Sequence, residues 1–228
     1  RPPRLCRRLG HRDRSASAPP SSSVLCSPAC GGSRAALSRP AAWVHLLFTG
    51  SAGGSASVLE IYLDTAAIAH RVTELGEEIA KDYRGKDLVL IGILKGAALF
   101  LADLSRALAV PAEVEVIQAS SYGAGTVSSG SVRIIGEVER DVRGRHLLLV
   151  DCIIDSGRTI EALARHFRER QPASIEAVVL LDKKCRRTVD VPVRYVGFTV
   201  PDRFLVGYGL DRGGLYRNLP YVAVIKPS

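Results

Sequence analysis

Cysteine is scarce in this sequence, and long hydrophobic runs are missing. The longest apolar stretch within residues 1–57, Ala41–Phe48, is interrupted by His45 and is far shorter than the ~20 apolar residues of a membrane-spanning helix. Only two of the five cysteines, Cys152 and Cys185, lie beyond residue 57, which is too few for a disulfide framework. We therefore expect a reducing compartment, and we predict a cytoplasmic protein with no membrane segment.

Net positive charge is also nearly absent from most of the chain, although the formal net charge is +8. Residues 1–57 hold eight Arg, no Lys and one acidic residue, a net charge of +7, so the other 171 residues carry a net charge of only +1. A near-neutral domain lacks the basic footprint of a nucleic-acid-binding protein. We expect no nucleic-acid partner.

The first 57 residues differ in character from the rest. They are rich in Arg, Ser, Ala, Pro and Gly without an amphipathic period, a composition that cannot bury enough apolar surface to offset the entropy of ordering. We predict a disordered tail at 1–57 and one domain at 58–228. Because the sequence has no Met and changes abruptly at Val58, we expect the native start near Val58, with upstream sequence before it. An organellar transit peptide and a functional basic arm are the alternatives.

Three helical patterns follow in the domain. Asp64 is a candidate N-cap of the first helix, and Gly85 is its stop signal. Between them, apolar residues recur at helical spacing: Ile68, Val72, Leu75 and Ile79. Two more helices are predicted after Gly96 and Gly157, with these apolar positions: Leu99, Leu101, Leu104 and Leu108, then Ile160, Leu163 and Phe167.

Seven continuous apolar runs bounded by turn residues predict buried strands. They are Leu88–Leu94, Val114–Ala119, Val132–Ile135, Leu147–Ile154, Ile175–Leu181, Tyr195–Val200 and Tyr221–Ile225. Since helical segments separate several of them, we predict an α/β fold with a mainly parallel, twisted sheet flanked by helices.

The segment Asp151–Thr159, with the sequence DCIIDSGRT, covers the end of the fourth of these strands and the turn after it. Ligands bind beyond the carboxyl ends of the strands in parallel sheets. The turn offers backbone N–H groups, close approach at Gly157 and the hydroxyls of Ser156 and Thr159, all at the positive end of a helix. This predicts an anion site, with Asp151 accepting hydrogen bonds from sugar hydroxyls or approaching a metal. A strand-to-helix turn with solvated acids is the alternative.

LLLVDCIIDSGRT resembles the phosphoribosyl diphosphate (PRPP) motif of phosphoribosyltransferases, and residues 59–227 are similar to the bacterial hypoxanthine-guanine phosphoribosyltransferases. The resemblance implies the type I phosphoribosyltransferase fold with a small base-binding hood. It implies an enzyme of purine salvage that transfers the phosphoribosyl group of PRPP to hypoxanthine or guanine, giving IMP or GMP and diphosphate, with Mg²⁺ as cofactor. It also implies a homodimer or homotetramer.

The resemblance further implies roles for individual residues. The acid near the purine N7, a general base or hydrogen-bond acceptor, is Asp155. The implied PRPP-binding residues are Asp151, Cys152, Asp155, Ser156, Gly157, Arg158, Thr159, Lys95, Gly96 and Arg217. The implied purine contacts are Lys183, Phe204 and Leu205, with Arg187 in support; the lid residues are Ser121 and Tyr122; the metal ligands are Asp211 and Asp151. In the family, the loop containing Lys95 often has a non-proline cis peptide bond.

Several of these segments also have a simpler interpretation. Lys95 fits a solvated lysine at a strand end, and the Gly/Ser-rich residues 121–130 fit a linker. The charge run at 183–187 fits a solvated face, and Phe204 fits a core position.

The chain departs from the family pattern in three places. Asp151-Cys152 stands where the family usually has Glu-Asp, Ser156 stands in place of Thr, and residues 212–214 (Arg-Gly-Gly) replace aromatic and acidic residues. A lost charge-assisted hydrogen bond costs roughly 1.5–3 kcal/mol. We therefore expect weaker binding of PRPP and Mg²⁺, and a lower KM for PRPP in Cys152→Asp.

Two other functions compete with this hypothesis. A protein of the same fold that senses nucleotides or regulates RNA, with weak or no catalysis, is the alternative from another class. Within the enzyme class, nothing in the sequence fixes what contacts the purine 2-position, so xanthine joins hypoxanthine and guanine as a candidate substrate.

Overall fold

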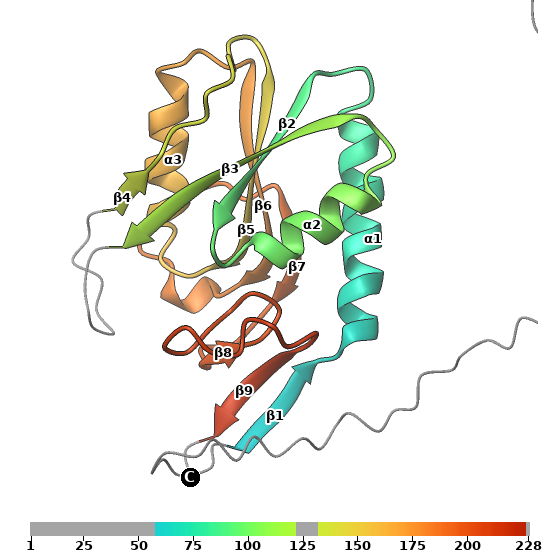
Figure 1. Cartoon of the computed structure of the whole chain (residues 1–228), viewed down its shortest axis with the longest axis vertical. Helices are drawn as coiled ribbons and strands as arrows, with labels where there is room; N and C mark the ends of the chain where they lie inside the picture. Colours follow the sequence, from blue (N-terminus) through green and yellow to red (C-terminus); the bar gives the residue numbers. More distant parts are fainter. Residues whose placement is uncertain (1–57, 122–131, 227–228) are drawn as a thin grey trace, which may run out of the picture. The chain divides into compact units, whose positions relative to one another are not determined.

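The structure, a computed structural model, describes residues 58–121 and 132–226 (Figure 1). Its larger sheet contains β2 (Leu88–Leu94), β3 (Ala112–Ser121), β4 (Val132–Ile135), β5 (His146–Ile154), β6 (Ser174–Asp182) and β7 (Tyr195–Thr199). The strand order is β4-β3-β2-β5-β6-β7, and every neighbouring pair is parallel except β3 and β4. The predicted mainly parallel sheet is confirmed, with strand ends that differ by at most two residues.

Three helices pack on this sheet: α1 (Thr65–Asp82), α2 (Ala98–Ala107) and α3 (Arg158–Arg168). The carboxylate of Asp64 accepts a hydrogen bond from the Ala67 N–H at 2.7 Å, which confirms the predicted N-cap of α1. The prediction for α2 was wrong at Leu99, which is exposed, because the buried stripe of α2 runs through Phe100, Leu101 and Leu104.

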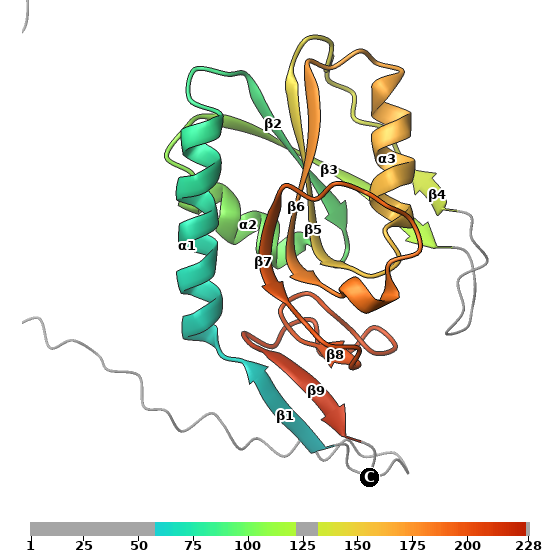
Figure 2. The same cartoon turned by 180° about the vertical axis from the view of Figure 1, so that it is seen from behind.

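Side chains alternate between the two faces of the sheet, as the pleat requires. On β5, Leu148 and Val150 pack on the face that α1 and α2 cover, whereas Leu147 and Leu149 pack against α3 on the other face. Figure 2 shows α3 and the pair α1 and α2 on opposite sides of the strands. The carboxyl ends of β2, β5 and β6 therefore meet along one edge, where ligands bind in such sheets.

A second, three-stranded antiparallel sheet has the order β1-β9-β8. Its strands are β1 (Val58–Leu63), β8 (Leu205–Val206) and β9 (Val222–Lys226). The run predicted at Tyr221–Ile225 thus belongs to this small sheet rather than to the parallel one. The sequence patterns did not predict β1 and β8, because a short amphipathic strand and a two-residue strand have too little periodicity. Among the described residues, no helix is long and apolar enough to cross a membrane.

Candidate active site

A tight turn connects β5 to α3. Gly157 adopts φ 88°, a left-handed conformation that favours glycine, and α3 begins at the next residue. A Cβ at this position would lie 3.0 Å from the carbonyl oxygen of Val189 and 3.0 Å from Cδ of Arg187. The turn is therefore closely backed by the segment after β6, while the first N–H groups of α3 have no acceptor within the helix and can receive an anion.

Asp155, in this turn, is the best-placed candidate base. Its Oδ1 is buried and has no hydrogen-bond partner among the described residues, and its Oδ2 lies 3.6 Å from a guanidinium nitrogen of Arg186. Arg186 also pairs with Asp202 at 2.9 Å, and Nζ of the buried Lys183 lies 3.9 Å from the same Asp202 carboxylate. The structure thus brings Asp155 and Lys183 into one network of charges, as the sequence predicts for a purine site.

The segment after β6 packs against the turn between β5 and α3 and forms hydrogen bonds with it. The Ser156 carbonyl oxygen accepts hydrogen bonds from the N–H groups of Thr188 and Val189 at 3.0 and 3.1 Å. Arg187 donates to the Asp182 carboxylate at 2.6 Å, and Asp182 is only 4% exposed. Arg187 therefore holds the backing segment in place.

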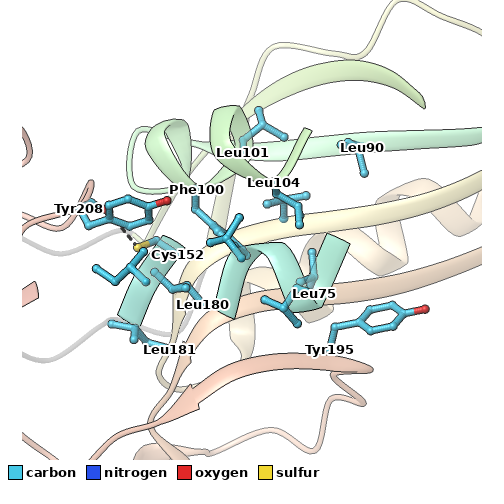
Figure 3. Packing of buried hydrophobic residues seen from close by; sticks show 14 of the residues in the cluster. Leu75, Leu90, Phe100, Leu101, Leu104, Cys152, Leu180, Leu181, Tyr195 and Tyr208 are labelled. Atoms are coloured by element: carbon cyan, nitrogen blue, oxygen red, sulfur yellow. Dashed lines mark hydrogen bonds between the residues drawn. The ribbon is translucent and has the colours of Figure 1, made fainter. Parts of the chain in front are cut away.

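Asp151 and Cys152 point to opposite faces of β5. The Asp151 carboxylate is partly buried, accepts from the Cys152 N–H at 2.7 Å, and burial raises its pKa to about 7. The Cys152 thiol is fully buried and donates to the carbonyl oxygen of Tyr208 at 3.3 Å (Figure 3). Burial, and secondarily the charge of Asp151, raises the pKa of this thiol.

The position of Cys152 corrects two expectations. A fully buried thiol has no surface for a ligand, so its side chain does not contact PRPP in this arrangement. For the same reason Cys152→Asp would bury a carboxylate beside the carbonyl oxygen of Tyr208, which is unfavourable. The structure therefore does not support a gain in PRPP affinity from that substitution.

The loop after β2 meets the loop after β8. The Leu94–Lys95 peptide bond is cis, as the family resemblance implies. Gly209 packs so closely on this loop that a Cβ would lie 2.1 Å from the carbonyl oxygen of Gly96. Arg217 donates to the carbonyl oxygen of Gly209 at 2.5 Å and pairs with Asp211 at 2.6 Å. The structure therefore brings Lys95, Gly96, Asp211 and Arg217 together.

Both oxygens of the Asp211 carboxylate have partners within the protein. Oδ1 pairs with Arg217 at 2.6 Å, and Oδ2 accepts from the Gly214 N–H at 2.6 Å. No group of three or more His, Cys, Asp or Glu side chains that could hold a metal ion occurs within residues 58–121 and 132–226. A Mg²⁺ ion that arrives with a phosphorylated substrate needs only one or two carboxylates, so Asp151 and Asp211 have the right donor chemistry for it.

Two of the predicted base-binding residues lie in or directly before β8 of the small sheet, and the third, Lys183, directly follows β6. Phe204 is 54% exposed, which rules out the core position that the sequence left open. Leu205 is buried in β8, so its side chain is not available to a ligand. Of the two predicted lid residues, Ser121 ends β3, and Tyr122 and the Gly/Ser-rich segment lie outside the described residues.

Comparison with known proteins agrees with this geometry. Residues 58–212 match the phosphoribosyl transferase domain. The chain belongs to the phosphoribosyltransferase family. Over 169 residues it is 44% identical to a hypoxanthine phosphoribosyltransferase of Salmonella typhimurium, covering 73% of this chain and 95% of the relative. It is 43% identical to a hypoxanthine-guanine phosphoribosyltransferase of Mycobacterium bovis, covering 75% and 87%.

Solved structures place the fold in the same family. A hypoxanthine phosphoribosyltransferase of Staphylococcus aureus superposes with a TM-score of 0.71 at 40% identity, covering 74% of this chain and 91% of that one. The expected type I phosphoribosyltransferase fold is confirmed, and so is the enzyme class, hypoxanthine phosphoribosyltransferase.

The sequence patterns missed three residues of this phosphoribosyltransferase site. Arg186 and Asp202 link Asp155 to Lys183, and Tyr208 supports the loop that carries Arg217. The only sequence signals were a charge run and an acid two residues before Phe204, neither of which specifies a pairing.

Proposed function

We propose that this chain transfers the 5-phosphoribosyl group of PRPP to hypoxanthine or guanine, producing IMP or GMP and diphosphate. The observation that carries the proposal is Asp155, whose buried oxygen lacks a partner among the described residues while Lys183 lies in the same charge network. Buried polar atoms are almost always hydrogen-bonded, so an orphaned acceptor beside an anion-binding turn indicates a ligand.

Lys183 and Asp155 act on different atoms of the purine. Lys183 is 7% exposed, and a buried ammonium group that donates to the exocyclic 6-oxygen polarises the ring. Asp155 then accepts the proton at N7, as a general base or a hydrogen-bond acceptor. Phe204 supplies an exposed ring on which the base stacks, and the Leu205 backbone contacts the edge of the base.

The sugar phosphate and the leaving group occupy two different loops. The 5-phosphate binds the turn formed by Ser156, Gly157, Arg158 and Thr159, at the N-terminus of α3. Lys95, the Gly96 backbone and Arg217 neutralise the departing diphosphate. Lid residues Ser121 and Tyr122 exclude water, which otherwise hydrolyses PRPP.

Asp151 and Asp211 are the proposed ligands of Mg²⁺, and Asp151 also accepts from the ribose hydroxyls. Bound with PRPP, the ion supplies positive charge to the leaving diphosphate. Because Arg217 holds Asp211 at 2.6 Å, binding of the metal and the diphosphate must share or exchange this pair.

The cellular setting follows from the chemistry of the chain. Cys152 and Cys185 are free, which fits a reducing compartment, and we place the reaction in the cytoplasm. The expected assembly is a homodimer or homotetramer, which light scattering after size-exclusion chromatography measures directly. The catalytic domain is 58–228, with 1–57 as an appended tail.

A nucleotide-sensing protein of the same fold is the second candidate, favoured by one observation: a buried thiol, Cys152, stands where the family usually has an acid. One assay separates the candidates. Purified protein is incubated with PRPP, Mg²⁺ and hypoxanthine, guanine, xanthine or adenine in turn, and nucleotide is measured by liquid chromatography. We expect IMP and GMP. Nucleotide formed from adenine alone, or no nucleotide from any of the four bases, would contradict the proposal.

A further inference from the structure

Tyr208 has an unusual backbone for a bulky residue. Its φ is 47°, in the left-handed region, and it lies between Gly207 and Gly209, whose φ values are 94° and 96°. A non-glycine residue is held in this region only when surrounding contacts over-determine it. The side chain of Tyr208 is 6% exposed, so the residue is anchored inside the protein and not at a free loop tip.

Three contacts to separate parts of the chain fix Tyr208. Its hydroxyl donates to Oδ2 of Asp103 on α2 at 2.5 Å. Its carbonyl oxygen accepts from the Cys152 thiol at the end of β5, and its N–H donates to the carbonyl oxygen of Leu219 at 2.9 Å. Figure 3 shows Tyr208 next to Cys152 of β5, with the hydrogen bond between them dashed, in the same hydrophobic cluster as Phe100 of α2.

The turn that contains Tyr208 lies between two parts of the proposed diphosphate site. One part is the Lys95–Gly96 loop, and the other is the segment with Asp211 and Arg217. On one side, Gly209 packs against the carbonyl oxygen of Gly96, directly after Lys95. On the other side, Gly209 and Arg217 are doubly bonded: the Gly209 N–H donates to the Arg217 carbonyl oxygen at 3.0 Å, and the Arg217 guanidinium donates back at 2.5 Å. Any shift of Tyr208 therefore displaces Arg217 relative to Lys95.

Asp103 is connected to the Lys95–Gly96 loop through the chain. It lies on α2, which begins three residues after Lys95 and continues directly from that loop. The bond between Tyr208 and Asp103 thus joins residues 105 positions apart in the sequence.

We propose that Tyr208, through its hydroxyl bond to Asp103, is a positioning residue that holds Arg217 and Asp211 in register with the Lys95–Gly96 loop. The proposal rests on the proposed function, in which these groups receive diphosphate. The Cys152 thiol is a second, weaker anchor of the same residue, because S–H is a weak donor. Cys152, which stands where the family usually has an acid, would thus help to hold Tyr208 in place.

The test is Tyr208→Phe, which keeps the ring and removes only the hydroxyl. We expect the KM for PRPP and the Kd for magnesium diphosphate to rise about tenfold, the scale of one lost hydrogen bond to a charged acceptor. The KM for hypoxanthine should stay within about twofold, since Lys183 and Asp155 lie on other loops. Magnesium diphosphate binding is measured by titration calorimetry, which needs no turnover.

Tyr195→Phe is the matched control. Tyr195 is also buried, and its hydroxyl donates to Asp82 at 2.6 Å. It lies on β7, the edge strand of the large sheet, and not on the loops of the proposed diphosphate site. This variant should lose similar thermal stability and keep its affinity for magnesium diphosphate. Equal affinities for diphosphate in the two variants would overturn the proposal and leave Tyr208 a purely structural residue.

Asp103 provides an independent pair of variants. Asp103→Asn keeps an acceptor for the hydroxyl and should retain most of the diphosphate affinity, whereas Asp103→Ala should match Tyr208→Phe and add nothing to it in the double variant. Additive losses would count against a shared bond. If the wild-type chain forms no nucleotide from any purine, the proposed function fails, and the calorimetric comparison still decides the role of Tyr208.

Discussion

Two consecutive arginines, Arg186 and Arg187, reach two acids at neighbouring strand ends, and the two pairs differ sharply. Arg187 meets Asp182 at 2.6 Å, and the Asp182 side chain is 5% exposed. Arg186 meets Asp155 at 3.6 Å, and the Asp155 side chain is 43% exposed. The first pair is tight and buried, whereas the second is loose and open to solvent.

The difference separates a structural charge from a functional one. Asp182 is paired directly with Arg187 and is almost wholly buried, so it contributes to the fold. Asp155 retains a buried oxygen without a partner among the described residues, which costs stability in the absence of a ligand. A buried acceptor without a partner, placed beside an anion-binding turn, is a candidate contact for a ligand.

Asp155→Asn should have the largest effect. Asn keeps the size of the side chain and cannot accept a proton, and loss of a general base typically lowers the rate roughly 10²- to 10⁴-fold. We expect kcat to fall at least about a hundredfold with an unchanged melting temperature, measured by the rate of IMP formation. The exposed Asp190→Asn, on the segment after β6, is the control and should keep full activity. Wild-type kcat in Asp155→Asn would exclude a proton-transfer role.

Asp182→Ala tests the structural side of the comparison. Removing one partner of a buried ion pair leaves the other uncompensated, at a cost of about 3 kcal/mol. We expect the free energy of unfolding, measured by urea titration, to drop by about that amount. Glu161→Ala breaks an exposed pair on α3, with Arg165 at 3.2 Å, and should cost only about 0.5 kcal/mol. Equal losses in the two variants would contradict the distinction.

Gly157→Ala tests the turn after Asp155, which packs against the segment that contains Arg187 and Val189. The left-handed conformation costs roughly 1–2 kcal/mol for a residue with a Cβ, and here the Cβ also meets the Val189 carbonyl oxygen at 3.0 Å. Gly85→Ala is a close control, because Gly85 has φ 74° and open space around it.

Gly85→Ala should lose stability through the left-handed conformation alone, and Gly157→Ala should lose at least as much in urea titration. Only Gly157→Ala should raise the KM for PRPP, about tenfold, which corresponds to 1.4 kcal/mol. A raised KM in Gly85→Ala as well would show that the effect is global and does not come from the phosphate-binding turn.

The fold was largely predictable because its signals are local. Asp64 caps α1, Ile68 and Leu75 lie on its buried stripe, and the apolar run of β5 marks a strand covered on both faces. The exceptions are β1 and β8 of the small sheet, whose pairing with β9 depends on residues more than 150 and about 20 positions apart, respectively.

The site was predictable where a motif carries it, and unpredictable where it depends on pairing. DCIIDSGRT located Asp155 and Gly157 from the sequence. Nothing local indicates that Tyr208 bonds Asp103, or that Cys152 turns inward, because both depend on which loop lies next to which strand end. The family resemblance supplied residue roles, and it was misleading at Cys152, where this chain differs from the family pattern.

Arg186→Gln should have the smallest effect of all. Its guanidinium is half exposed, and exposed ion pairs contribute little because water and salt screen them. We expect kcat/KM for hypoxanthine to change less than about fivefold, with no loss of stability, and the difference from wild type to shrink further at high salt. The adjacent Arg187→Gln, by contrast, should destabilise the protein as Asp182→Ala does. If Arg186→Gln instead abolishes activity at every salt concentration, Arg186 contacts the substrate itself, and the loose pair is as essential as the buried one.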